Sequence, residues 1–532
     1  MKRIISLLIA TALLTACSGG GKTTITTPSA EPTLDPTLDP TLPRELNIVA
    51  SRFEQHVDWD QMYVWQKMEE DTGIKVNWEY IPSSAIEEQR NLRVSTNNLP
   101  DVFYGCRWTA QEMAQYGTDG IFVPLDPYLE TSAPNVTRLY NDMPDVKQAM
   151  ILSDGHIYGF PLVYVDKLVG TSMLLRESWM TESGLALPKT PYDVLDIMKA
   201  MKAKDPKRLV YSDYEDQTAY AGLIQTLNGA WGLGNRGGGN GYFDANPDDT
   251  TKVRFWATSD RFKEVLALIR DMYNAGCIDP DSLTQNEVAW GAKSAQKDPA
   301  VIGVVTNDTL SAYNAENDYV GTGILTGPYG DNLWASVRLR VSRNANYVVT
   351  KACKNVPLAV EFADYWMDNA DHTVMFFNGE EGNHWNWNDA HTLRIPADWQ
   401  TNDPEGRSLD QMRSTWTSQP GGSYFGVIQP LLSLDTSHNG QVADSLVKPY
   451  LPSIVWPTFS LTLDELKVSS STGVDILTHY EESVTSFITG KLSLETDWDK
   501  YVKTFDDMGL KDLVKVYQDA YDRYLAAGGK AS

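Results

Sequence analysis

Aromatic side chains are the residues of this sequence best suited to hold a ligand. The chain has 16 Trp and 26 Tyr, and several of them fall in segments with neither helical nor strand periodicity. A flat ring buries the apolar C–H face of a sugar ring, while carboxylates accept hydrogen bonds from the sugar hydroxyl groups. We therefore predict ligand contacts at six aromatic residues and two acids: Trp59, Trp108, Trp231, Tyr329, Trp385, Trp387, Asp101 and Glu381.

Each of these residues also has a structural alternative. A single ring packs beneath a loop about as often as it contacts a ligand, and Asp101 or Glu381 suits a helix cap or a solvated surface equally well. The set as a whole favours binding, because its tryptophans cluster in loops, outside the periodic faces of helices and strands, and two of them follow predicted strands. Trp59 follows a strand at 46–53 and Trp108 follows a strand at 101–104. The carboxyl ends of strands face the ligand crevice in open α/β sheets.

Motifs for catalysis, phosphate binding or metal binding are incomplete. The glycine-rich segment 234–241 lacks the Lys-Ser/Thr pair of a phosphate loop, and the Ser-x-x-Lys at 294–297 lacks the companion motifs of penicillin-binding enzymes. Only seven His occur, and His384 beside Glu380 and Glu381 has no third metal ligand at a convincing spacing. We expect no catalytic residue, no metal and no cofactor.

The composition is that of an acidic globular protein. The chain has 532 residues, 42% of them hydrophobic, with 70 acidic and 45 basic side chains and a net charge of −25. This length suggests two or more domains. The acidic excess argues against nucleic-acid binding and disfavours polyanionic glycans. Four Cys exclude a disulfide scaffold, and Cys106, Cys277 and Cys353 are expected to be buried free thiols.

The N-terminus predicts export and anchoring. Lys2 and Arg3 precede an apolar run at 4–14, which is shorter than the roughly 20 residues of a membrane span. The run ends in Leu-Thr-Ala-Cys17 and resembles a bacterial lipoprotein signal, which implies a signal peptide at 1–16 and a palmitate-type lipid on Cys17. A plain secretory signal is the alternative. Residues 17–43 form a Pro/Thr/Gly-rich tether.

Strand and helix patterns alternate through the rest of the chain. A strand at 46–50, a helix at 60–72 and a strand at 76–80 form a βαβ unit, so we predict an α/β fold. Thr109 and Glu112 predict a capping box. Further helices are predicted from apolar stripes that start near Thr190 and at 259–275, near Pro357 and at 510–524.

Five segments in order resemble one family. They are Asn98–Val102, Asp154–Pro161, Leu174–Pro206, Gly379–Trp385 and Phe487–Tyr524. Together they are similar to the family 1 extracellular solute-binding lipoproteins of ABC importers for sugars, and most of all to the LipO-type subgroup of Gram-positive bacteria. The resemblance runs from about residue 44 to the C-terminus.

The resemblance implies a two-lobed, periplasmic-binding-protein-like (type II) fold with a hinge and an interlobe ligand cleft. It assigns 44–160 to lobe 1, with a returning middle segment at roughly 300–345 or later, and 161–532 to lobe 2 and the C-terminal helices. Crossings are expected near 160–161 and 345–350. Some relatives carry a calcium loop after the position of Asp205-Pro206, but this sequence lacks it, which puts calcium there in doubt.

The resemblance also implies a function. It suggests a monomer at the extracellular face of the cell membrane that binds a carbohydrate, in particular an oligosaccharide, and delivers it to ABC permease subunits without altering it. Two alternatives remain open. An anchored glycoside hydrolase needs two carboxyl groups roughly 5–10 Å apart. A surface glycan-binding or scaffold protein would have no role in transport.

Overall fold

The computed structural model describes most of the chain beyond the N-terminal segment. The described residues are 37–165, 168–213, 221–234, 242–285, 287–294, 302–307, 318–343, 345–368, 371–387, 394–397, 404, 407, 409–419, 425–428, 438–452, 455–456 and 460–529. Cys17, the predicted signal peptide and most of the predicted tether lie outside these ranges. No helix within them is both long and apolar enough to cross a bilayer.

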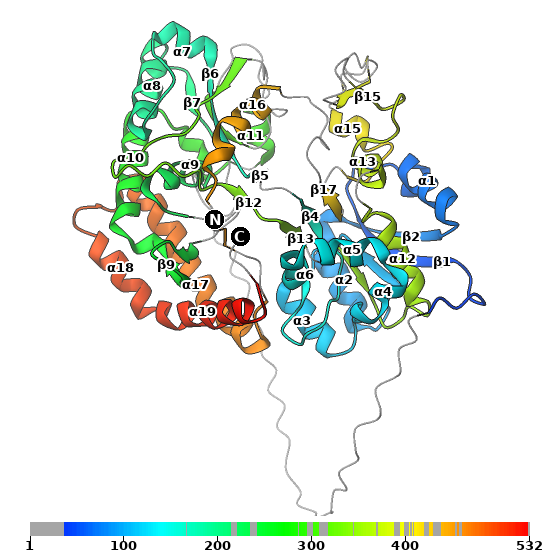
Figure 1. The fold of residues 1–532 in the computed structure, drawn as a ribbon. Helices are drawn as coiled ribbons and strands as arrows, with labels where there is room; N and C mark the ends of the chain where they lie inside the picture. Colours follow the sequence, from blue (N-terminus) through cyan, green and yellow to red (C-terminus); the bar gives the residue numbers. More distant parts are fainter. Residues whose placement is uncertain are drawn as a thin grey trace, which may run out of the picture. The chain divides into compact units, whose positions relative to one another are not determined.

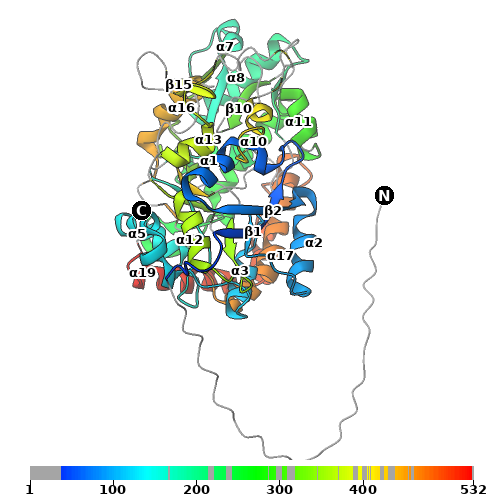
Figure 2. The same ribbon diagram turned by 90° about the vertical axis from the view of Figure 1, so that its right-hand side faces the viewer.

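The first lobe is built on a four-stranded sheet with the order β14-β3-β1-β2. β1 runs parallel to β2 and β3, as the predicted βαβ unit requires, and β14 joins antiparallel to β3. Figure 2 shows β1 and β2 side by side. The strands and the helices that follow β1 and β2 are β1 (Glu45–Arg52), α1 (Tyr63–Thr72), β2 (Lys75–Pro82), α2 (Ile86–Ser95), β3 (Val102–Tyr104) and β14 (Tyr347–Val349).

Local sequence signals explain the ends of these elements. α1 ends at Gly73, which adopts the left-handed conformation with φ 67° that glycine accepts most easily. The predicted capping box is present at the start of α3 (Ala110–Thr118), because the Thr109 hydroxyl accepts from the Glu112 N–H and the Glu112 carboxylate accepts from the Thr109 N–H. The strands and helices bury their apolar side chains in two clusters. The larger, called the first core, draws on distant parts of the chain, 46–163, 341–377 and 425–427. The smaller includes Val49, Phe103 and Met113.

The second lobe has its own sheet, with the order β11-β6-β10-β7. β7 and β10 run parallel, while β6 is antiparallel to both β10 and β11. Figure 1 shows α7 and α8 beside β6 and β7. The elements named here are β6 (Ser172–Arg176), α7 (Glu177–Ser183), α8 (Pro191–Lys204), β7 (Leu209–Tyr211), β10 (Ile302–Asn307) and β11 (Tyr319–Gly321).

Helices predicted from apolar stripes complete this lobe. The structure confirms them as α8, α10 (Asp260–Asn274) and α19 (Leu510–Ala526), and in the first lobe as α12 (Val356–Tyr365). Most of their apolar residues are buried, and Phe262 and Ile269 on α10 are fully buried. The second core also contains residues of α17 (Leu463–Ile488) and α18 (Trp498–Asp507).

Three strands mark where the chain passes between the two cores. β4 (Leu162–Tyr164) pairs with β13 (Val341–Arg343) and with β17 (Gly426–Ile428), and all three contribute a valine to the first core. Directly after β4 and directly before β13, the short strands β5 (Leu168–Val169) and β12 (Val337–Arg338) pair with each other. Val169 belongs to the second core. The segment that returns to the first core therefore begins at β13.

The remaining elements connect these parts. They are α4 (Leu129–Ser132), α5 (Pro134–Asp142), α6 (Pro144–Met150), α9 (Ala221–Leu227), β8 (Phe243–Asn246), β9 (Asp249–Phe255), α11 (Glu287–Ser294), α13 (Asp371–Asn378), β15 (Trp385–Trp387), β16 (Arg394–Pro396), α15 (Leu409–Arg413) and α16 (His438–Val447), with 3-10 turns η1 (Trp59–Gln61), η2 (Ser83–Ala85), η3 (Asp126–Tyr128), η4 (Asn228–Trp231), η5 (Trp256–Thr258), η6 (Pro280–Leu283) and η8 (Lys448–Tyr450).

Candidate functional site

The carboxyl edge of each sheet is the natural place to look for a ligand site, because side chains after parallel strands converge there. In the first lobe this edge carries the segments 53–59 and 105–108, which follow β1 and β3. In the second lobe it carries the residues that follow β7 and β10.

Trp59 lies at the first of these edges but does not offer a free ring. Its indole is fully buried, stacks on Trp65 at a centroid distance of 5.5 Å and meets Trp78 edge-on at 4.8 Å. Its Nε1–H donates to His56 Nδ1 over 3.3 Å. This ring is therefore a core residue that holds the end of β1, and the expectation of an open aromatic surface here is not met.

Trp108 and Trp231 are also buried. Trp108 is 5% exposed, and the Arg90 guanidinium carbon lies 4.3 Å from its ring centroid. Trp231 is fully buried at the end of η4, where its Nε1–H donates to Glu264 Oε2 over 2.8 Å. Both rings pack beneath loops. This is the structural role that the sequence left open as the alternative to ligand contact for each of them.

Several side chains at the first edge keep exposed surface, and two of them, Phe53 and Arg107, contact each other and are missed by a search for tryptophans. Arg107 is exposed, and its guanidinium carbon lies 5.7 Å from the ring centroid of half-buried Phe53. Arg107 has φ 55°, one of two positive values found for non-glycine residues within the described ranges. This conformation costs an L-residue roughly 1–2 kcal/mol, whereas an exposed cation–π contact returns roughly 0.5–1 kcal/mol.

Buried neighbours impose this conformation on Arg107. The N–H of Gly105 donates to the carbonyl of Asn346 over 2.6 Å. The Cys106 thiol is buried beneath it near the carbonyl of Val49, and burial raises its pKa to about 12. With Trp108 buried on the other side, the backbone of the loop is fixed and the Arg107 side chain is directed outward.

The second edge presents Asp213 directly after β7. Its Oδ2 accepts from the Tyr211 hydroxyl over 2.7 Å, and that hydroxyl lies 3.0 Å from the Thr306 hydroxyl of β10. These oxygens are suited to hydrogen bonding with sugar hydroxyl groups. The sequence gives no signal for Asp213, because one aspartate after a short strand is common.

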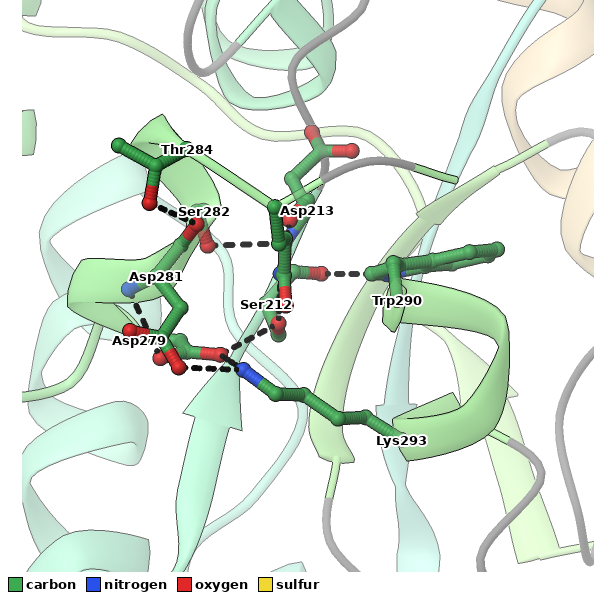
Figure 3. A network of polar contacts seen from close by, with 9 residues as sticks. Ser212, Asp213, Asp279, Asp281, Ser282, Thr284, Trp290 and Lys293 are labelled. Atoms are coloured by element: carbon green, nitrogen blue, oxygen red, sulfur yellow. Dashed lines mark hydrogen bonds and ion pairs between the residues drawn. The ribbon is translucent and has the colours of Figure 1, made fainter. Parts of the chain in front are cut away.

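A polar network fixes the backbone at this second edge (Figure 3). Buried Asp279 accepts from the Ser212 hydroxyl over 2.8 Å and from Lys293 Nζ over 2.8 Å, and Lys293 also reaches Asp281 at 2.9 Å. The Trp290 Nε1–H donates to the Ser212 carbonyl over 3.2 Å. The network ties η6 and α11 to the end of β7, so it orients the residues that follow this strand.

The other predicted contact residues lie elsewhere. Asp101 precedes β3, and its Oδ2 accepts from the backbone and side-chain amides of Asn47 over 2.8 and 2.9 Å. It therefore lies at the amino end of the strand, away from the carboxyl edge. Tyr329 is 55% exposed, but its hydroxyl donates to Glu264 over 2.6 Å and Arg261 covers its ring at 4.6 Å.

The segment with the remaining candidates forms part of a small hairpin. Trp385 in β15 is 4% exposed and donates its Nε1–H to the Gly379 carbonyl over 3.1 Å. Trp387 meets it edge-on at 5.5 Å and is half-buried, while Glu381 is exposed. Of the predicted contact residues in this segment, Trp387 and Glu381 are therefore the ones with solvent-exposed surface.

Within the described ranges, burial raises the pKa of two carboxyl groups, those of Asp364 and Asp244. The Asp364 pKa rises to about 6, and this carboxyl accepts from the N–H groups of Asn135 and Val136 at the start of α5. The Asp244 pKa is also raised, although Arg254 lies 2.6 Å away. Both are structural partners within the lobes, unlike the two facing carboxyl groups of a glycosidase.

The described ranges contain no group of three or more His, Cys, Asp or Glu residues that could hold a metal ion. His384 is instead held by neighbouring residues. Its Nδ1 accepts from the Glu380 N–H over 2.9 Å, and its ring stacks on Trp416 at 4.5 Å. Burial lowers the His384 pKa.

A fold of two α/β lobes, each with its own sheet and joined by paired strands, is the architecture of solute-binding proteins. Residues 53–372 match the family model of bacterial extracellular solute-binding proteins, and the chain belongs to this family.

Curated relatives align with most of the chain. The fructooligosaccharide ABC transporter substrate-binding protein FusA of Streptococcus pneumoniae serotype 4 is 23% identical over 99% of this chain and 98% of its own length. Its structure in complex with kestose superposes with a TM-score of 0.73 over 91% of this chain and 99% of that chain, at 21% identity. Lipoprotein LipO of Bacillus subtilis is 23% identical over 85% of this chain and 88% of its own length. The polygalacturonan/rhamnogalacturonan-binding protein YtcQ of the same species is 20% identical over 86% of this chain and 87% of its own length.

Proposed function

We propose that this protein is the lipid-anchored substrate-binding component of an ABC importer and captures an oligosaccharide between its two lobes. The observation that carries the proposal is the near-complete alignment with FusA, whose structure is known with kestose. The carboxyl edge of each lobe supports it, because one edge offers an aromatic ring and a guanidinium and the other offers hydroxyl and carboxylate oxygens.

The proposed contacts divide between the two edges. Phe53 supplies the flat surface against which a sugar ring stacks, and Asp213 accepts hydrogen bonds from sugar hydroxyl groups. Trp387, Glu381 and Tyr329 keep exposed surface and extend the set. Trp59, Trp108, Trp231, Trp385 and Asp101 act behind these residues by holding the loops and the hairpin in place.

The strands that join the lobes support a hinge. The chain leaves the first core after β4 and β17 and re-enters it at β13, and these three strands are paired with one another. Bending next to them would open and close the two lobes around a ligand, since hinges need only a few residues that absorb backbone rotation. The domain boundaries that we propose therefore lie at 164–168, at 338–341 and after 428.

Anchoring rests on Cys17. Lipid on this residue, followed by the Pro-rich tether, would hold the lobes near the outer face of the membrane within reach of the permease subunits. The test is metabolic labelling with a palmitate analogue in a Gram-positive host. Cys17→Ala should lose the label and release the protein into the medium. A label that persists in the Cys17→Ala variant would contradict the proposed anchor.

The binding function is tested by a thermal-shift screen of neutral and acidic oligosaccharides on the lipid-free protein. A ligand at one hundred times its Kd should add roughly 2.7 kcal/mol to the free energy of unfolding. Phe53→Leu should then weaken the best hit at least tenfold while Phe53→Trp retains it, because stacking requires a flat ring. A screen in which no saccharide shifts the melting temperature would favour the scaffold alternative.

Whether the ligand is cleaved distinguishes a glycoside hydrolase from a binding protein. Saturable binding without release of new reducing ends supports a binding protein. Shorter products that appear in proportion to protein concentration would support an anchored glycosidase instead.

A further inference from the structure

The loop after β3 combines a strained backbone with an outward-directed charge. Arg107 adopts φ 55° between buried Cys106 and buried Trp108. A glycine would make the same turn without strain, so the backbone alone gives no reason for an arginine. Strained non-glycine residues cluster at ligand sites, where the strain is tolerated because the side chain is needed for function.

The charge of Arg107 differs from that of most other arginines because it has no carboxylate partner among the described residues. Most arginines of the described ranges are paired with a carboxylate, and Arg52 at the same sheet edge is paired with Asp58. For Arg107 the described residues provide the Phe53 ring at 5.7 Å and no ion pair. An exposed guanidinium thus stands beside an aromatic surface, in a chain whose net charge is −25.

The ring and the guanidinium together point to one class of ligand. A guanidinium presents parallel N–H donors that match the two oxygens of a carboxylate. A sugar that stacks on Phe53 would bring a carboxylate on its edge toward Arg107. A neutral sugar would contact the same ring but leave the charge of Arg107 without a counter-charge.

We infer that Arg107 is a specificity-determining residue that binds the carboxylate of an acidic sugar, whose ring lies against Phe53. This inference rests on the proposed carbohydrate-binding function and narrows it to saccharides that carry a uronic or sialic acid. The net charge of −25 disfavours long polyanions, so a short acidic oligosaccharide is expected.

Matched ligands test the inference on the lipid-free full chain by calorimetric titration. The first pair is trigalacturonate and its fully methyl-esterified form, and the second is sialyllactose and lactose. We expect one acidic member to bind at least about tenfold more tightly than its neutral partner, and the identity of that member separates uronate from sialate. Equal affinity within both pairs, or tight binding of neutral fructans alone, would overturn the inference.

Variants show whether Arg107 causes this preference. Arg107→Gln should bring the acidic and neutral ligands to equal affinity, whereas Arg138→Gln, an exposed arginine of α5 hydrogen-bonded to Asn135, should leave the preference unchanged. Phe53→Leu should weaken both members of a pair by similar factors. A preference that survives in Arg107→Gln would assign the carboxylate to another residue.

A stability measurement separates a binding role from a structural one. Arg107→Gly should raise the melting temperature by roughly 1–3 °C as strain is relieved, while it removes the preference for the acidic ligand. A lower melting temperature would show that Arg107 serves the fold. If no saccharide binds the wild-type protein, the proposed function fails, whereas neutral binding without an Arg107 effect overturns only the inference.

Discussion

Replacing Trp59 by Ala distinguishes a structural tryptophan from a ligand-binding one. The ring is fully buried and contacts four aromatic residues of the first lobe at centroid distances between 4.8 and 6.0 Å: Trp65, Trp78, Tyr80 and Tyr104. Truncating such a side chain removes its buried area and leaves a cavity, which together cost roughly 3–5 kcal/mol. Each aromatic pair adds up to about 1.5 kcal/mol beyond buried area, so we expect the upper half of that range.

Calorimetry of the lipid-free protein measures this effect. For a lobe of about 200 residues, 1 kcal/mol shifts the melting temperature by roughly 2–4 °C, so Trp59→Ala should lower the transition of the first lobe by about 10 °C or more. Trp59→Phe keeps an aromatic ring in the core and should lower the melting temperature of the first lobe much less. The second lobe, whose core is separate, should melt at nearly its original temperature.

The opposite pattern would refute this account of Trp59. If Trp59→Ala melts like the wild-type protein but loses affinity for the ligand found in the screen, the ring contacts the ligand and its burial is misassigned. Trp387→Ala is the matched control, because this half-buried ring should change stability by less than about 1 kcal/mol.

Three further predictions concern buried ionisable groups. Burial raises the pKa of Asp364 in the folded state from the ordinary 3.8 to about 6, so its stabilising contribution is complete below pH 4 and is lost as the pH rises through 6. Thermal unfolding between pH 4 and 7 should show this loss, at most about 3 kcal/mol, and Asp364→Asn should abolish it. Lys293→Met should lower the free energy of unfolding of the second lobe by about 1–3 kcal/mol in urea titrations, because buried Asp279 loses its counter-charge. Adding Asp279→Asn to this variant should restore most of the lost free energy. Three thiols should remain unreactive toward an aromatic disulfide reagent at pH 8 until the chain unfolds, because burial raises their pKa values to about 12, 11 and 12: Cys106, Cys277 and Cys353.

The sequence predicts the fold well because its signals are local and repeated. Apolar stripes on helices such as α10 and α19 require burial, and capping residues such as Thr109 and Thr190 fix where helices start. The family motifs then supply the two-lobed arrangement, which no local pattern contains. Free thiols were expected to be buried, and Cys106, Cys277 and Cys353 are.

The candidate site is harder to predict, because residue type does not reveal which way a side chain points. Trp59 and Trp108 follow strands as expected, yet both turn inward and fill the core. Asp101 directly precedes β3 and so lies at the amino end of the strand, which its position in the chain already implies. Arg107 carries no aromatic signal, and its backbone conformation becomes visible only in three dimensions.

A titration followed by recovery of the ligand shows directly whether the protein binds a saccharide and leaves it unaltered. The lipid-free protein is titrated with the best saccharide from the screen, then denatured, and the ligand is analysed by mass spectrometry. The account predicts saturation at one ligand per chain and recovery of a saccharide of unchanged length. Cleaved products, or no saturable binding of any saccharide, would contradict it.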